Sequence, residues 1–156
     1  SRILDDGVLK DRPWSRREWR RRWPNSVERY RALHGDVYKR LDPTAREYFE
    51  ETLTFMNERG QTPVTALTPI NPKLRRIVAT LGWAERYREV VAYVESLQGE
   101  YDFAFLDMTD PAVFDFDKNE WYDGVHMTTV NTRRAIDYIT AQTGGWPPSQ
   151  PPADGQ

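Results

Sequence analysis

The chain contains no cysteine, which excludes disulfides, thiolate metal sites and cysteine nucleophiles. It has no apolar run near the roughly 18–20 residues that a membrane helix needs, and no apolar N-terminal segment typical of a signal peptide, so we expect no membrane span. Histidine is scarce as well, and His34 and His126 are the two candidates for a general base. The 156 residues include 6 Trp, 8 Tyr and 6 Phe, which is enough apolar material for one folded domain.

The net charge of −2 conceals an uneven distribution. Residues 1–50 contain 13 Lys and Arg against 9 Asp and Glu, whereas residues 51–156 contain 9 against 15. Most of the positive excess lies in residues 12–31, where arginines alternate with Trp and Tyr. Such a segment could bind phosphates and stack on bases, bind anionic lipid or cell-wall polymer, or form a solvated helix with its aromatic side chains packed inward. The pI of about 5.7 disfavours nucleic acid and favours the solvated helix.

The N-terminal part of the chain predicts a hairpin followed by helices. Asp6-Gly7 lies between two short apolar pairs and indicates a tight turn. A short helix over residues 14–22 is expected to end at Pro24, and a second helical stretch over residues 27–40 is expected to be interrupted by Gly35.

Alternating helix and strand patterns in the rest of the chain predict an α/β domain. The expected helices begin at Thr44, Leu74, Trp83 and Thr128, and the expected strands cover residues 63–68 and 101–106. Thr44 and Glu47 form a capping box at the start of the first helix, which Gly60 is expected to end. We therefore divide the chain into an Arg- and Trp-rich segment (1–42), an α/β core portion (43–142) and a disordered Pro-rich tail (143–156).

Two strands are few for a parallel sheet, which in a chain of this length would ordinarily have about four or five. Either further strands lie in the first 40 residues, or the sequence is the second half of a larger α/β domain. In the second case we expect exposed sheet edges, poor stability of residues 1–156 alone, and association with another chain that completes the sheet.

The motif with the most evident chemistry is Asp123-x-x-His126, in the region between the second strand and the last helix. A carboxylate three residues before a histidine can accept a hydrogen bond from the imidazole, fix its tautomer and stabilise the imidazolium. Loops at the carboxyl ends of parallel strands are also where open α/β sheets place their sites. The alternative is a simple Asp-Gly turn, with Asp123 capping backbone N–H groups and His126 packed against the next helix.

The run Trp121-Tyr122-Asp123-Gly124-Val125-His126-Met127-Thr128, followed by a helix, resembles the last sequence block of the SGNH/GDSL hydrolase superfamily. The order of the elements over residues 43–142 is similar to the second half of that fold, and most of all to its cell-envelope O-acyltransferases and esterases. The resemblance implies a three-layer α/β/α, flavodoxin-like parallel sheet, of which this chain would hold the C-terminal part. It also implies that His126 is the general base and Asp123 its orienting carboxylate.

Further expectations follow from the same resemblance. The loops over residues 69–72 and 107–122 would wall a substrate cleft, so Asn71, Trp121 and Tyr122 are candidate substrate-binding residues. The substrate would be an acylated carbohydrate or another ester, without a cofactor, and the location would be outside the cytoplasm or at the cell envelope, with the cytoplasm as the alternative.

The family's nucleophile and oxyanion donors are not recognisable in this sequence. The serines at positions 1, 15, 26, 96 and 149 do not follow a strand in a glycine-flanked turn, which is the geometry that exposes a nucleophile. We therefore expect the chain to supply the Asp–His half of a triad whose Gly-Asp-Ser-like block lies upstream.

Two other functions are consistent with the residues. Asp115, Asp117, Glu120 and Asp123 could hold a cation, but their spacing matches neither an EF-hand loop nor another named cation motif, so we predict no metal site. A non-catalytic SGNH-derived domain could instead bind an envelope glycan or a partner protein through its Arg- and Trp-rich segment.

Overall fold

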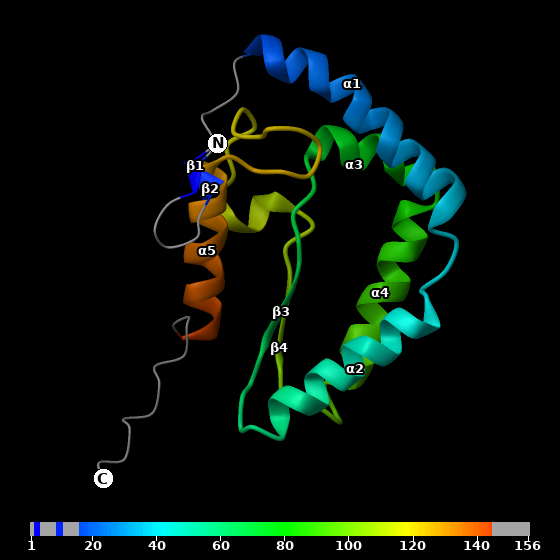
Figure 1. The fold of residues 1–156 in the computed structure, drawn as a ribbon, viewed down its shortest axis with the longest axis vertical. Coiled ribbons are helices and arrows are strands. Elements are labelled where there is room, and N and C mark those ends of the chain that lie inside the picture. Colours follow the sequence, from blue (N-terminus) through cyan, green and yellow to red (C-terminus); the bar gives the residue numbers. More distant parts are fainter. Residues whose placement is uncertain (1, 4–8, 11–15, 145–156) are drawn as a thin grey trace.

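The computed structural model describes residues 2–3, 9–10 and 16–144 (Figure 1). Its elements, in chain order, are β1 (Arg2–Ile3), β2 (Leu9–Lys10), α1 (Arg16–Ala32), a π-helical turn (Leu33–Val37), α2 (Pro43–Asn57), β3 (Val64–Leu67), α3 (Pro72–Ala79), α4 (Trp83–Leu97), β4 (Ala104–Asp107), a 3-10 turn (Pro111–Phe114) and α5 (Thr129–Thr143). No helix among the described residues is long and apolar enough to cross a membrane.

The two shortest strands form the predicted N-terminal hairpin. β1 and β2 are antiparallel, with Arg2 opposite Lys10 and Ile3 opposite Leu9. The expected turn at Asp6-Gly7 lies outside the described residues, as does the predicted tail from residue 145 onward.

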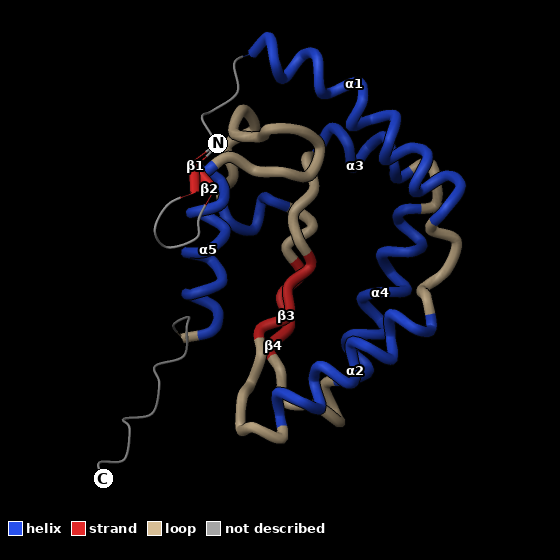
Figure 2. The backbone as a smooth tube through the Cα atoms, in the orientation of Figure 1, coloured by secondary structure: helices blue, strands red, loops and turns tan. Residues whose placement is uncertain are grey.

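A parallel pair of strands lies at the centre of the molecule (Figure 2). β3 and β4 pair in register from Val64 opposite Ala104 to Leu67 opposite Asp107, and they form a two-stranded sheet within the described residues. The architecture is therefore α/β, as predicted, with a small parallel sheet in the described part of the chain. β3 begins and ends within one residue of the predicted strand over residues 63–68. β4 ends within one residue of the predicted strand over residues 101–106 but begins three residues later than predicted.

Helices cover both faces of this sheet. Consecutive strand residues point to opposite faces, so apolar neighbours on one strand need a packing partner on each side. Phe105 packs with Leu53 of α2 and with Val94 and Leu97 of α4. Its neighbour Leu106 packs on the other side, in a cluster with three buried side chains, Met108, Phe114 and Ala135 of α5. Figure 1 shows the same arrangement, with α5 on one side of the strands and α2 and α4 on the other.

The first helix corrects the sequence prediction. α1 runs without a break through Pro24 to Ala32, so the predicted end at Pro24 and the separate second helix are wrong. A proline inside a helix costs about 3 kcal/mol, but Trp23, Val27 and Tyr30 on this helix pack against the buried cluster of α3. Three large side chains contribute more by burial than the proline costs. The expected interruption near Gly35 is present as the π-helical turn.

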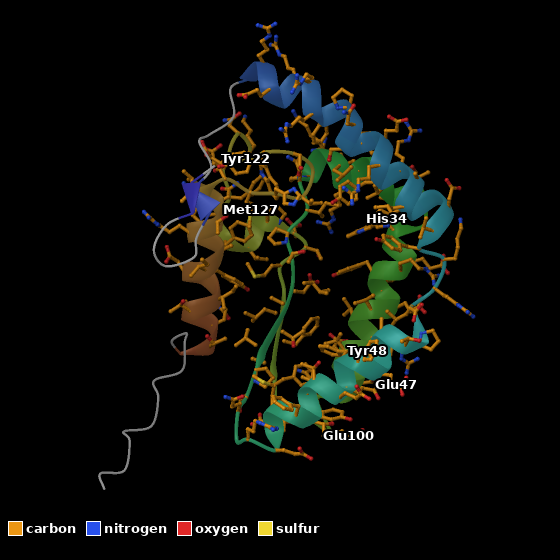
Figure 3. All side chains as sticks on the ribbon, viewed as in Figure 1. His34, Glu47, Tyr48, Glu100, Tyr122 and Met127 are labelled. Carbon is orange, nitrogen blue, oxygen red and sulfur yellow. The ribbon has the colours of Figure 1, made fainter. Side chains whose placement is uncertain are left out.

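The start of α2 also differs from the prediction. The N-cap is Asp42, whose carboxylate Oδ1 accepts hydrogen bonds from the N–H groups of Thr44 (2.8 Å) and Ala45 (3.2 Å). Pro43 takes the first helical position, where its fixed φ and missing N–H are favourable. The helix thus begins earlier than a capping box at Thr44 requires, and Glu47, labelled in Figure 3, lies in the exposed first turns without a capping role.

This difference can be measured. Asp42→Ala should destabilise the folded state by about 1 kcal/mol because two backbone N–H groups lose their acceptor. Glu47→Ala, the matched control, should change the free energy of unfolding by less than about 0.5 kcal/mol. Urea unfolding followed by circular dichroism measures both values. A larger loss of unfolding free energy in Glu47→Ala than in Asp42→Ala would contradict the Asp42 cap and support the capping box at Thr44.

Candidate functional site

The segment before α5 is held in place by one buried amide. Asn131, on the first turn of α5, is fully buried. Its Oδ1 accepts from the N–H of Asp117 (2.8 Å), and its Nδ2 donates to the carbonyl oxygens of Asp117 and Glu120 (both 2.9 Å). These hydrogen bonds fix the position of the acidic segment's backbone relative to α5, although the sequence of the segment has neither helix nor strand periodicity.

Residues 121–127, which we call the 121–127 loop, fold back on themselves. Trp121 and Met127 form an isolated antiparallel bridge, and the N–H of Tyr122 donates to the carbonyl oxygen of His126 (2.8 Å). Figure 3 places Tyr122 and Met127 beside the N-terminal end of α5. The residues between them form the tip of the loop and include the predicted Asp and His.

Gly124 fastens this tip to two distant helices. Its N–H donates to Ser26 Oγ of α1 (3.2 Å), and its carbonyl accepts from the N–H of Asn71, the N-cap of α3 (2.9 Å). The glycine is buried so closely that a Cβ would lie 2.3 Å from Leu74 Cδ2. The backbone at Gly124 therefore lies closer to Leu74 of α3 than a residue with a side chain would permit.

The predicted pair of Asp123 and His126, which we call the Asp–His pair, is formed. Asp123 Oδ2 lies 2.8 Å from His126 Nδ1. Oδ1 of the same carboxylate accepts from the N–H groups of Val125 (2.8 Å) and His126 (2.9 Å). Because an ionised carboxylate only accepts, Nδ1 carries the proton, and Nε2 of the neutral ring is the free acceptor. The capping of backbone N–H groups by Asp123 and the histidine contact, posed as alternatives from the sequence, occur together, whereas His126 is exposed and not packed away as that alternative expected.

The electrostatics of Asp123 favour its charged form. Burial alone would raise its pKa, but the hydrogen bonds from Val125 N–H and from the ring and N–H of His126 outweigh burial and hold the pKa below its usual value. The side chain of Asp123 is 18% exposed and that of His126 is 70% exposed. A shielded, ionised carboxylate thus orients an accessible imidazole.

The Asp–His pair opens into a groove of about 450 Å³ that we call the α1 groove. Its lining residues are Arg21, Arg22, Asn25, Ser26, Arg29, Tyr30, Asp123 and His126. The first six come from one face of α1, where residues three or four positions apart lie on the same side. The Arg-rich segment and the Asp–His pair, which the sequence analysis treated separately, therefore form one site.

The other predicted site residues have different environments. Asn71 is 3% exposed, and its Oδ1 accepts from the N–H of Lys73 (2.9 Å) at the start of α3. Trp121 is also 3% exposed and packs edge-on against Phe116. Both side chains are buried in this structure, and their substrate contact stays a prediction. Tyr122 is half-buried in the 121–127 loop, and its substrate contact stays a prediction as well.

Sequence reasoning missed the α1 side of the groove. The signal was present in the spacing of Arg21, Asn25 and Arg29, which repeats every fourth residue. This spacing places the three side chains on one face only if the helix is continuous, and the predicted break at Pro24 separated Arg21 from the other two.

A second cavity of about 420 Å³ lies between the C-terminal ends of β3 and β4 and helix α4, and His34, Trp83 and Tyr87 are among its lining residues. Beneath it, the Tyr87 hydroxyl donates to Asp107, and this bond is the largest of the causes that raise the pKa of Tyr87. Burial lowers the pKa of His34, whose Nδ1 is buried without a hydrogen-bond partner in the described structure.

The α1 groove contains one candidate general base, His126, and several cationic hydrogen-bond donors, the arginine side chains. His126 Nε2 can take a proton from a hydroxyl group, and Asp123 stabilises the resulting imidazolium. Ser26 lies in the groove, but its Oγ accepts a hydrogen bond from Gly124 and is part of the contact between α1 and the loop. Within the described residues, no three His, Cys, Asp or Glu side chains are grouped so that they could hold a metal ion.

Comparison with known proteins gives little. No protein family model matches the chain, and no solved structure matches it. A glutamate–tRNA ligase of Lachnoclostridium phytofermentans is 28% identical over 65 residues, which are 42% of this chain and 13% of that enzyme. The chain thus spans about an eighth of that protein, and the likeness is partial.

The contact at Gly124 generates one prediction. Gly124→Ala should destabilise the folded state by about 1–3 kcal/mol, because the new methyl group overlaps Leu74. Gly99→Ala is the matched control, since a Cβ there has no atom within 4 Å. Chemical denaturation of both variants measures the difference, and equal stability would contradict the close packing.

Asp123 generates a second prediction, on pH. Asn at this position keeps the Oδ1 acceptor but removes the charge. Because the folded-state pKa lies below the unfolded value of about 3.9, the carboxylate adds stability that is fully present above about pH 4 and is lost as the pH falls through the folded-state pKa. Asp123→Asn should therefore be less stable than the unmodified protein at pH 7, and thermal melts should show the gap closing in acid. A gap that stays constant down to pH 2.5 would contradict this assignment.

Proposed function

We propose that this chain supplies the Asp–His half of the triad of an SGNH-like serine esterase or O-acyltransferase. The observation that carries the proposal is the 2.8 Å contact between Asp123 Oδ2 and His126 Nδ1, with the carboxylate fixed by two backbone N–H groups. This is the arrangement in which a histidine serves as general base in acyl transfer. The partial likeness to a tRNA ligase transfers no function, because it covers 13% of that enzyme.

The finer fold belongs to the same proposal. The central strands β3 and β4 are parallel, and helices lie on both faces of the pair. A three-layer α/β/α domain of flavodoxin-like, SGNH type would continue this sheet with further strands. Those strands would come from polypeptide outside the given sequence or from a partner chain, which would also cover the strand edges.

In the proposed reaction, a serine hydroxyl attacks the carbonyl carbon of an ester while His126 Nε2 takes the hydroxyl proton. The C–O bond of the ester breaks and the leaving alcohol receives that proton from His126. Water or a sugar hydroxyl then resolves the acyl-enzyme by the same two proton transfers. The substrate would be an acylated carbohydrate or another ester of the cell envelope, and the location would be outside the cytoplasm. We assign the nucleophile to a Gly-Asp-Ser-like block outside residues 1–156.

Activity of the native polypeptide that contains this sequence tests the proposal. Turnover of acetyl esters should fall by about 10²–10⁴-fold in His126→Ala, because the general base is lost. Asp123→Asn should lower it as well, since the ring loses the carboxylate that fixes its tautomer. His34→Gln, which alters the second histidine outside the α1 groove, should retain activity.

A fluorophosphonate probe completes this test, because it labels only an activated serine. Labelling that disappears in His126→Ala supports the triad. Full turnover in His126→Ala, or an absence of labelled serine, would reject hydrolysis by this route. The domain would then be the non-catalytic alternative, which binds an envelope glycan or a partner protein.

A further inference from the structure

Some of the arginines of α1 line the same groove as the proposed base. Arg21 and Arg29 are separated by two helical turns, with Asn25 between them, and all three line the α1 groove with His126. Cationic and amide N–H donors thus form one wall of the groove, and the Asp–His pair lies at the other.

The negative charge in the groove does not neutralise Arg21 or Arg29. Asp123 is the acidic residue of the lining, and both of its oxygens accept hydrogen bonds from residues of its own loop. Among the described residues, neither Arg21 nor Arg29 forms an ion pair with a carboxylate. The groove therefore presents positive charge to whatever enters it.

Tyr30 adds a neutral donor to the same wall. Burial is the largest cause that raises its pKa, with the charge of Asp123 next, so its hydroxyl keeps its proton at neutral pH. Planar guanidinium groups, an amide and a hydroxyl are a donor set that suits the oxygens of a phosphate or carboxylate.

We propose that the α1 groove binds an oxyanion, and that the substrate is an ester carrying a phosphate or carboxylate close to the acyl group that reacts at His126. The binding of the anion follows from the arginines alone, whereas its role in holding a substrate rests on the proposed esterase function. Arg21 and Arg29 would hold the anionic group, and this contact would orient the ester toward Nε2 of His126.

Binding is tested with inorganic phosphate, by NMR titration of the backbone amides. Phosphate should shift the signals of α1 and of the 121–127 loop together. The double variant Arg21→Gln/Arg29→Gln should weaken this binding by about tenfold or more, because two charge-assisted contacts are lost. Arg88→Gln/Arg133→Gln is the matched control, since it removes the same charge from exposed positions on α4 and α5. An equal loss in both pairs, or none in the first, would overturn the proposal.

Turnover separates this inference from the proposed function. The native polypeptide is given 4-acetoxybenzoate, which is anionic, and its neutral methyl ester. We expect kcat/KM to be at least tenfold higher for the anion, and this preference to disappear in the Arg21→Gln/Arg29→Gln variant. Equal turnover of both esters would reject the anionic substrate but keep the esterase. Phosphate binding without turnover of either ester would reject the esterase but keep the oxyanion site.

Discussion

The closeness of Gly124 to α3 is the constraint on which the site depends. At this glycine the 121–127 loop lies directly against Leu74, and Ser26 and Asn71 hold the N–H and the carbonyl oxygen of the same residue. One residue without a side chain therefore joins three segments that are far apart in the sequence. A loop held at this point places its neighbours on either side at fixed positions, so Asp123 is shielded and the ring of His126 projects into the α1 groove.

Much of the fold could be predicted because its signals are local. Amphipathic periodicity and Gly82, which has a positive φ of 88°, indicated α3 and α4, and β-branched and apolar runs indicated β3 and β4. The Asp–His pair was equally local, since its hydrogen bonds close within four residues. The cap of α2 was predicted wrongly because Asp42 and Thr44 are both good cap residues, and the proline after Asp42 decides between them.

The remaining features could not be predicted because they depend on tertiary contacts. Pro24 normally ends a helix, whereas the packing of Trp23, Val27 and Tyr30 against the cluster of α3 favours a continuous α1. The burial of Trp121 was unpredictable for the same reason, because its sequence position beside the motif does not reveal that it packs in the core. A pattern gives the residues that can act, whereas the folded chain determines which of them face the groove.

Charge placement gives the groove its chemical character. The basic excess of residues 1–50 and the acidic excess of residues 51–156 meet where α1 crosses the 121–127 loop. No ion pair joins Arg29 to Asp123 among the described residues. Instead the carboxylate is satisfied by backbone N–H groups and by an imidazole, at the low pKa that these bonds produce. Arg21 and Arg29 therefore form no ion pair with Asp123, and their positive charge beside a basic nitrogen is the electrostatic reason for proposing an anionic ester over a neutral one.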